Sequence, residues 1–217
     1  MSFDVTYALT ILPALLRASL LTLAATFGGM ALALVFGLAC AILRMSRLRI
    51  VSWTATGVTQ VVRTTPLLVQ LYLLFYVLPT YGIAMSAFAT GVLGLGLHYG
   101  SYISEVYRAG IEAVPRSQWE ASVALGFSRS RTWTSVILPQ AFRRIIPPIG
   151  NYLVSMFKAT PYLATITVLE LLGTALNLAD NSFRYFEPIT LVGLIFLALS
   201  YPSAQFVRRL EKRFMNE

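Results

Sequence analysis

The sequence predicts an all-α integral membrane protein, a helical bundle of five transmembrane helices that form one domain over residues 1–217. Hydrophobic residues make up 57% of the chain and charged residues only 12%, whereas about a quarter of the residues of a soluble protein are charged. The mean hydropathy is +0.70, and several apolar runs approach the ~20 residues that cross a bilayer. Arginines collect between these runs. The apolar runs occupy so much of the chain that no remaining stretch is long enough for a soluble catalytic domain.

The first span is expected over residues 20–42. Gly29, Ala33 and Gly37 recur in it at four-residue spacing, which gives a helix a smooth face for close packing. The basic residues that follow are Arg44, Arg47 and Arg49. The positive-inside rule places this end in the cytoplasm and the N-terminus outside. The first ten residues contain no lysine or arginine, so we expect no cleaved signal peptide.

The second span is expected over residues 58–78. The mostly apolar run over residues 67–78 gives only about 18 Å of helix against a hydrocarbon core of about 30 Å. The span must therefore reach back past Pro66 and Arg63, which places the arginine inside the cytoplasmic half of the bundle. A charge at this depth needs a partner.

Three further spans are expected over residues 88–106, 148–168 and 189–206. Residues 169–187 carry little net positive charge, so this segment is expected outside the membrane. The basic residues after the last span are Arg208, Arg209, Lys212 and Arg213. They place the C-terminus in the cytoplasm, and an odd number of spans agrees with this charge distribution.

Residues 115–139 form the longest polar interruption of the chain, and we call them the cytoplasmic knob. Ser117 precedes Glu120 by three residues, which predicts a capping box at the start of a helix over residues 118–125. Gly126 supplies the left-handed residue that ends this helix.

A second short helix is expected over residues 129–138. Ser128 is its predicted N-cap. Pro139 is its predicted end, because proline has no N–H to donate. Two capped helices at an angle to each other make a stiff element, and an ordinary membrane loop needs neither cap.

The knob resembles the Glu-Ala-Ala loop of the permease subunits of binding-protein-dependent ABC importers. The residues that carry this match are Glu120, Ala121, Gly126, Leu138 and Pro139. Ser122 and Val136 depart from the family pattern by small changes. Residues 63–70 and 138–151 resemble segments of the polar amino acid branch of the family, so the resemblance covers most of the chain.

The resemblance implies the type I importer fold and a set of partners. These are an ABC ATPase, a second permease subunit that is identical or a sister chain, and an extracytoplasmic solute-binding protein, all working at the cell inner membrane. In the family the loop is a coupling helix that docks into a cleft of the ATPase. The residues expected at that contact are Ser117, Glu120, Ala121, Gly126, Arg129, Arg131, Leu138 and Pro139.

The chain has no phosphate-binding loop for a nucleotide. Its two lysines, Lys158 and Lys212, follow Phe157 and Glu211, not the glycine of a G-x-x-x-x-G-K-[ST] motif. We therefore expect a transport subunit that is not an enzyme and binds no cofactor, with ATP and Mg²⁺ on the partner ATPase. The basic residues that give the chain its net charge of +8 are expected to contact lipid headgroups and that ATPase rather than nucleic acid.

Polar residues in the fourth span indicate a substrate pathway, because transporters place polar groups of broken helices at mid-bilayer. Lys158 is expected to attract the carboxylate of a zwitterionic solute. Asn151, Ser155 and Thr160 are expected to offer hydrogen bonds to it. The alternative is that Lys158 forms a structural pair.

Two other polar residues are each open to two interpretations. His98, the only histidine, either packs between helices or lines the pathway, and without nearby cysteine or acid it is no metal ligand. Glu105 forms either an ion pair with Arg63 that braces an inner gate, or a pair with Arg108 at i,i+3 on its own helix.

The substrate is expected to be a polar amino acid or a similar zwitterion. Residues 95–122 and 183–211 resemble the permeases for ectoine and hydroxyectoine, compact zwitterions with one carboxylate, so these solutes are favoured. The alternative is an ion-coupled secondary transporter. Such carriers commonly place acidic residues in the membrane, and Glu105 is the only candidate here.

Overall fold

The computed structural model describes residues 3–215, and the first two and last two residues of the predicted domain lie outside this range. The described residues form helices joined by short turns, with no strand among them. In chain order the elements are α1 (Val5–Arg44), α2 (Arg49–Thr64), α3 (Leu67–Tyr72), η1 (Leu73–Val77), η2 (Leu78–Tyr81), α4 (Ala87–Glu112), α5 (Arg116–Ala124), α6 (Arg129–Thr132), η3 (Trp133–Ile137), α7 (Leu138–Ala159), η4 (Thr160–Ile166), α8 (Leu171–Ser182) and α9 (Phe186–Met215). The prediction of an all-α fold is confirmed.

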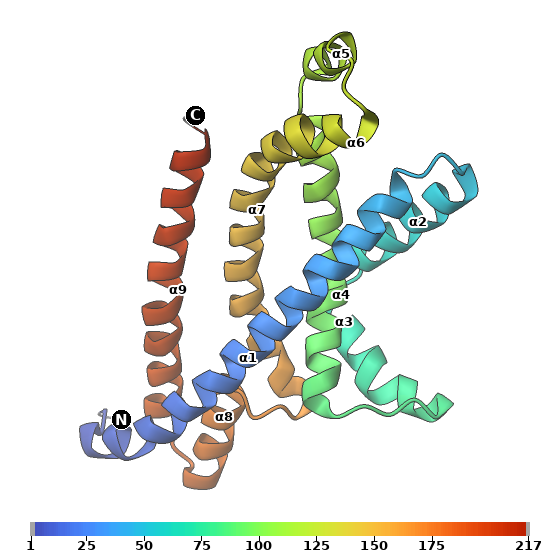
Figure 1. Cartoon of the computed structure of the whole chain (residues 1–217). Coiled ribbons are helices and arrows are strands. Elements are labelled where there is room, and N and C mark those ends of the chain that lie inside the picture. The colour runs from blue at the N-terminus through green and yellow to red at the C-terminus, as the bar shows by residue number, and fades with distance from the viewer. Residues whose placement is uncertain (1–2, 216–217) are drawn as a thin grey trace.

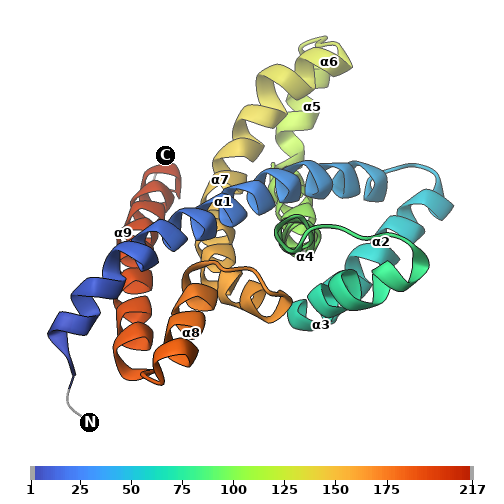
Figure 2. The same ribbon diagram turned by 90° about the horizontal axis from the view of Figure 1, so that it is seen from below.

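The long helix α1 crosses the bundle diagonally and packs against α4 (Figures 1 and 2). Its predicted small-residue face makes this contact, since Gly29, Ala33 and Gly37 are all buried. A Cβ at Gly37 would lie 2.8 Å from the backbone oxygen of Gly100 on α4. The two backbones approach closely because neither residue carries a side chain at the crossing point.

The predicted second span is broken. The segments Arg49–Thr64 and Leu67–Tyr81 meet at 104° instead of continuing as one helix. Thr65 is extended because it precedes Pro66. The Gln70 amide donates to the carbonyls of Val62 at 2.6 Å and of Thr65 at 3.0 Å, which satisfies backbone groups that the break leaves open.

The second knob helix does not end at Pro139, contrary to the prediction. The chain passes from α6 through the π-turn η3 into α7, where Pro139 lies in the first turn. A missing N–H costs nothing in a first turn, and a π-turn allows the helix to widen at this point. The helices α4 and α7 are connected at the top of Figure 1 by the knob, which projects beyond their ends.

The predicted fourth span corresponds to the end of α7 and the 3₁₀ turn η4, followed by a 44° bend into α8. Glu170 begins α8 and is fully buried, although it belongs to the segment expected outside the membrane. Its carboxylate accepts a hydrogen bond from the Gly173 N–H at 2.9 Å and from the Thr22 hydroxyl of α1 at 3.3 Å. Burial is possible because these donors replace water.

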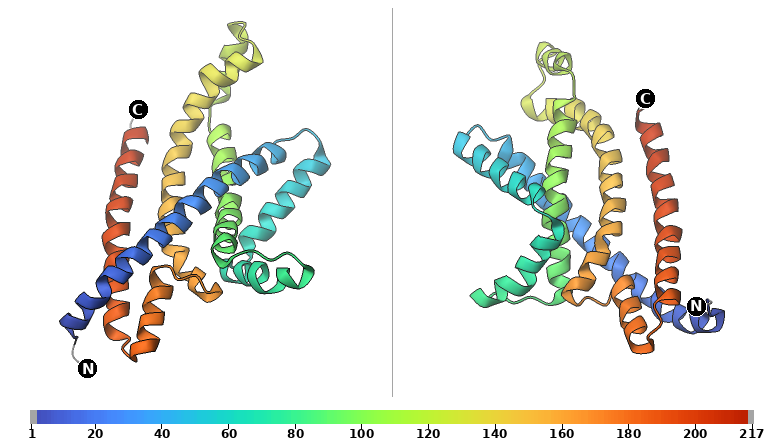
Figure 3. Two further views of the ribbon diagram at one scale, coloured as in Figure 1. Left: turned by 60° about the horizontal axis from the view of Figure 1, so that its bottom comes forward. Right: turned by 180° about the vertical axis from the view of Figure 1, so that it is seen from behind.

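The helix α9, the predicted fifth span, stands beside α7 (Figure 3), and most of its apolar surface is not buried within the bundle. By length and composition, α1 and α9 of the described chain can each cross a membrane, and the two bent pairs raise the number to four at most. The helix α4, the predicted third span, is not among them. Its glycines, its serines and His98 lower its hydropathy, yet its 26 residues run through the centre of the bundle.

The start of α1 is bound to the turn between α8 and α9. Asp4 caps α1 by accepting from the Tyr7 N–H at 3.1 Å and pairs with Arg184 at 3.0 Å. The Tyr7 N–H and the Arg184 guanidinium hold the pKa of Asp4 below its usual value. The Asp4 N–H donates to Glu187 at 3.0 Å. These contacts close the end of the bundle opposite the knob.

Candidate functional site

Glu105 of α4 binds three arginines from three elements. Its Oε1 accepts from Arg44 Nη2 at 2.8 Å and from Arg63 Nη1 at 2.7 Å, and its Oε2 lies 3.0 Å from Arg108 Nη2. The two alternatives for Glu105 are therefore both present. Sequence reasoning missed Arg44, which it used only to assign topology, although a side chain that ends an apolar run can turn back into the bundle.

The network connects the inner ends of α1, α2 and α4. The Arg44 side chain is 9% exposed and also donates to Ser104 Oγ at 3.2 Å. Arg108 additionally binds Glu112 at 2.7 Å. Three guanidinium groups share two carboxylates, so the cluster keeps a net positive charge.

The network makes a specific prediction about charge reversal. Exchanging the partners in Arg63→Glu/Glu105→Arg will not rescue the single variants, because an arginine at position 105 faces Arg44 and Arg108 at under about 4 Å, where like charges repel. The measurement is the yield and uptake of the double variant beside Arg63→Glu alone. Recovery of yield and uptake to near the wild-type level would show that the Arg63–Glu105 pair, and not the contacts of Glu105 with Arg44 and Arg108, determines the effect of the variants.

Two cavities that share Arg63 and Tyr102 lie along α4, and together we call them the α4 groove. The larger one measures about 560 Å³ and is enclosed by residues 63–68 with side chains of α4, α7 and η4. The smaller one measures about 400 Å³ and includes Glu105, Arg144 and Tyr152. The groove runs from the break between α2 and α3 to the charged cluster near the knob.

Aromatic side chains line this groove. The His98 ring lies 5.3 Å from each of the Tyr99 and Tyr102 rings, and Tyr152 lies 5.7 Å from Tyr102. The Tyr102 hydroxyl donates to the Arg63 carbonyl at 3.0 Å. His98 Nδ1 is buried without a hydrogen-bond partner among the described residues. The His98 ring lines the larger cavity and also packs against the Tyr99 and Tyr102 rings, so the structure is compatible with both interpretations of His98.

The other predicted pathway residues lie on α7 and η4. Asn151, Ser155 and Lys158 are exposed on one helical face, at the i, i+4, i+7 spacing. Lys158 forms no ion pair within residues 3–215. Thr160 does not join this face. It is fully buried and donates to the Phe157 carbonyl at 2.7 Å, because η4 turns its side chain inward.

The start of the knob differs from the prediction. The helix α5 begins directly after Pro115 and has no side-chain cap, so Ser117 and Glu120 lie within the helix and form no capping box. The proline, with its fixed φ, takes the N-cap position two residues earlier than expected.

The end of α5 and the start of α6 are as predicted. Gly126 has φ +70, the left-handed conformation, and the Phe127 N–H reaches back to the Ser122 carbonyl at 3.0 Å. Ser128 caps α6 by accepting from the Arg131 N–H at 3.3 Å. The Trp119 and Trp133 rings meet edge to face at 5.1 Å, and this contact joins α5 to η3.

The predicted contact residues of the knob are accessible. Seven are exposed and Leu138 is half-buried: the exposed ones are Ser117, Glu120, Ala121, Gly126, Arg129, Arg131 and Pro139. Two apolar side chains that sequence reasoning missed are also exposed, Val123 at 75% and Leu125 at 72%. A stiff polar element with two exposed apolar side chains is suited to docking in a partner's groove.

Comparison with known proteins relates this geometry to a family. Residues 33–216 match the family model described as binding-protein-dependent transport system inner membrane component. A probable amino-acid ABC transporter permease protein, y4tG of Sinorhizobium fredii, is 46% identical over 94% of this chain and 89% of its own length. The L-cystine transport system permease protein TcyB of Bacillus subtilis is 36% identical, over 88% and 82% of the two chains.

A solved structure agrees with these relatives. The chain described as "Crystal structure of an amino acid ABC transporter with histidines" has a TM-score of 0.92 and 30% identity, and the match covers 98% of this chain and all of that one. Both the family and the type I permease fold expected from the knob are thus confirmed. This chain belongs to the inner-membrane permease subunits of binding-protein-dependent ABC importers, and among these to the amino acid ABC transporter permeases.

Proposed function

We propose that this permease carries a polar amino acid or an amino-acid-like zwitterion into the cytoplasm, with ectoine and hydroxyectoine as the favoured solutes. The observation that carries the proposal is the α4 groove, which combines cationic and aromatic side chains beside a row of polar groups on α7. Arg63, Arg144 and Lys158 supply positive charge for a carboxylate. Tyr99 and Tyr152 supply aromatic faces for the cationic end of a zwitterion.

The knob transmits the movement of the ATPase to the membrane helices. ATP binding closes a pair of ATPase subunits and moves the docked knob. The helices attached to it then rock so that the groove opens to the solute-binding protein. The N-terminus lies outside and the C-terminus in the cytoplasm, and a second permease copy or a sister chain covers the exposed polar face of α7. Ion-coupled transport is disfavoured because Glu105 is already bound by three arginines and is not free to bind an ion.

The experiment is uptake into proteoliposomes that contain the permease, its ATPase and its binding protein. Ectoine, hydroxyectoine, glutamine, arginine and cystine are compared as solutes. We expect ATP-dependent uptake of a zwitterion and none without the ATPase. Accumulation driven by an ion gradient with the permease alone would establish the secondary transporter instead. ATP-dependent uptake of another amino acid in place of ectoine would keep the importer and reject the favoured solutes.

Lys158→Met tests the pathway. We expect the apparent KM for solute to rise about fivefold to tenfold, because one charge-assisted contact to the carboxylate is lost. The measurement is the solute dependence of ATP-driven uptake. Lys212→Met is the matched control, since the other lysine lies near the C-terminus on α9 and its loss is expected to leave KM unchanged. An unchanged KM in Lys158→Met removes Lys158 from the pathway.

A further inference from the structure

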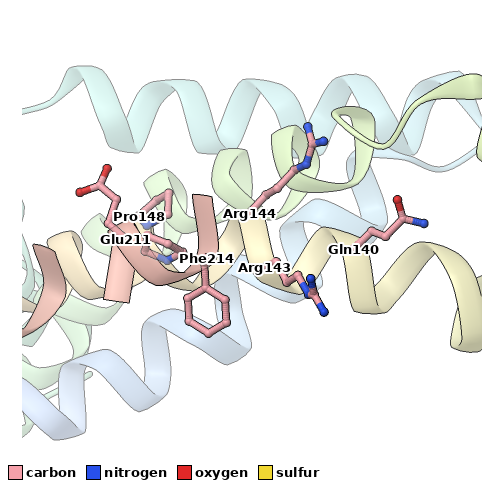
Figure 4. A pocket seen from close by; sticks show the side chains of 7 residues that line it. Gln140, Arg143, Arg144, Pro148, Glu211 and Phe214 are labelled. Atoms are coloured by element: carbon pink, nitrogen blue, oxygen red, sulfur yellow. The ribbon is translucent and has the colours of Figure 1, made fainter. Parts of the chain in front are cut away.

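The ends of α7 and α9 near the knob line a cavity of about 510 Å³, which shares Arg144 and Pro148 with the α4 groove. It is lined by Arg143, Arg144, Pro147, Pro148, Glu211 and Phe214, together with one glutamine. In Figure 4, Arg143 and Phe214 point to one side of the cavity, and Arg144 and Glu211 point to the other. One side therefore combines a guanidinium group with an apolar ring.

The surroundings of this cavity are strongly basic. Besides Arg143 and Arg144, the last turns of α9 carry four exposed cations: Arg208, Arg209, Lys212 and Arg213. Glu211 is the single carboxylate on these parts of the two helices within the described chain. This excess of cations creates a positive potential that attracts an anionic group.

A second cavity, of about 390 Å³, lies in the membrane between the same two helices and α1. Its lining is mostly apolar and includes Leu153 and Phe157 of α7 and Leu199 and Phe206 of α9. Because α7 and α9 are antiparallel, this cavity is deeper than the basic one along both helices. From Arg144 to Leu153 the helix rises about 14 Å, which is close to the roughly 15 Å thickness of one leaflet's hydrocarbon.

We propose that the cleft between α7 and α9 binds one anionic phospholipid of the inner leaflet. Its phosphate lies on the side of the cavity to which Arg143 points, beside the cations of the last turns of α9, and its acyl chain follows the apolar side chains of the cleft. Basic cavities between membrane helices at the cytoplasmic surface suit such headgroups. Neither a soluble phosphate nor the ATPase accounts for the apolar cavity within the membrane. The proposal goes beyond the transport function and requires only that this end faces the cytoplasm.

Photo-crosslinking tests the proposal. The permease, assembled with its ATPase, is placed in phosphatidylcholine nanodiscs that contain a little phosphatidylglycerol with a photoreactive acyl chain, and adducts are mapped by peptide mass spectrometry. We expect adducts on residues 153–157 of α7 and 199–207 of α9. Photoreactive phosphatidylcholine with the same chain is expected to label these peptides several-fold less.

Variants of one arginine identify the headgroup contact. Arg143→Gln should lower labelling by phosphatidylglycerol about fivefold, the effect of one cation near the surface, and Arg143→Lys should retain it. Arg47→Gln removes the same charge from the exposed turn after α1 and should leave labelling unchanged. Co-elution with the ATPase shows that each variant is assembled.

Four results would overturn the proposal. They are equal labelling by the two lipids, wild-type labelling of Arg143→Gln, displacement of the photoreactive lipid by soluble glycerol phosphate, and labelling of the cleft only after the ATPase is removed. The third would assign the basic cavity to a soluble phosphate, and the fourth would assign this surface to the ATPase.

Discussion

Leu125→Asp is expected to abolish uptake while the permease still folds and inserts. Leu125 is 72% exposed on the knob, so the free permease loses no internal packing. In the docking that we propose, this side chain enters the ATPase groove, where an unpaired carboxylate costs several kcal/mol. A cost of about 3 kcal/mol lowers the docking equilibrium more than a hundredfold. Val123→Asp should act in the same way.

The measurement is co-purification with the ATPase together with ATP-driven uptake. Leu48→Asp is the matched control, because Leu48 is 68% exposed in the turn between α1 and α2 and lies outside the knob. It is expected to keep both properties. Normal association and uptake in Leu125→Asp and Val123→Asp together would show that the exposed apolar side chains of the knob are not the ATPase contact.

Glu105→Gln is expected to cause the largest loss of stability of any single charge change in the bundle. The substitution leaves Arg44, Arg63 and Arg108 close together without their shared carboxylate. Breaking a buried pair costs about 3–5 kcal/mol. Because the Glu105 side chain is 26% exposed, water screens part of that penalty and we expect about 2 kcal/mol. At this chain length, such a loss lowers Tm by about 4–8 °C.

Thermal unfolding of the purified permease in detergent measures this effect. Glu112→Gln is the matched control, since the ion pair of Glu112 within residues 3–215 is with Arg108 and its side chain is 55% exposed. An exposed pair of this kind contributes about 0–1 kcal/mol, so its Tm should remain within about 4 °C of wild type. Equal Tm values for the two variants would show that the three-arginine network does not stabilise the bundle.

Several elements followed from local sequence. The small-residue face of α1 was predictable because four-residue spacing of glycine and alanine has few uses other than close helix packing. Gly126 and Ser128 were predictable because turn and cap positions depend on the backbone of a few neighbouring residues. The family followed from the knob for the same reason, since its motif lies within one short stretch.

Two local predictions failed through competition between signals. The capping box at Ser117 was expected from spacing alone, but Pro115 takes the N-cap position and draws Ser117 into the helix. Pro139 was expected to stop a helix, but the π-turn before it places the proline in a first turn, where its missing N–H is harmless. In both cases a neighbouring residue determined which of two allowed conformations formed.

The sequence by itself determined a helical membrane protein with basic segments between its apolar runs and a stiff knob, because hydropathy and capping act over neighbouring residues. Only the tertiary structure decided that Arg44, Arg63 and Arg108 share Glu105. It likewise decided that Glu170 is buried against Thr22 and that His98 faces a cavity with Tyr102. These arrangements join residues up to 148 positions apart. Their formation depends on how α1 crosses α4 and how α2 breaks, which is a property of packing between helices and not of any single stretch.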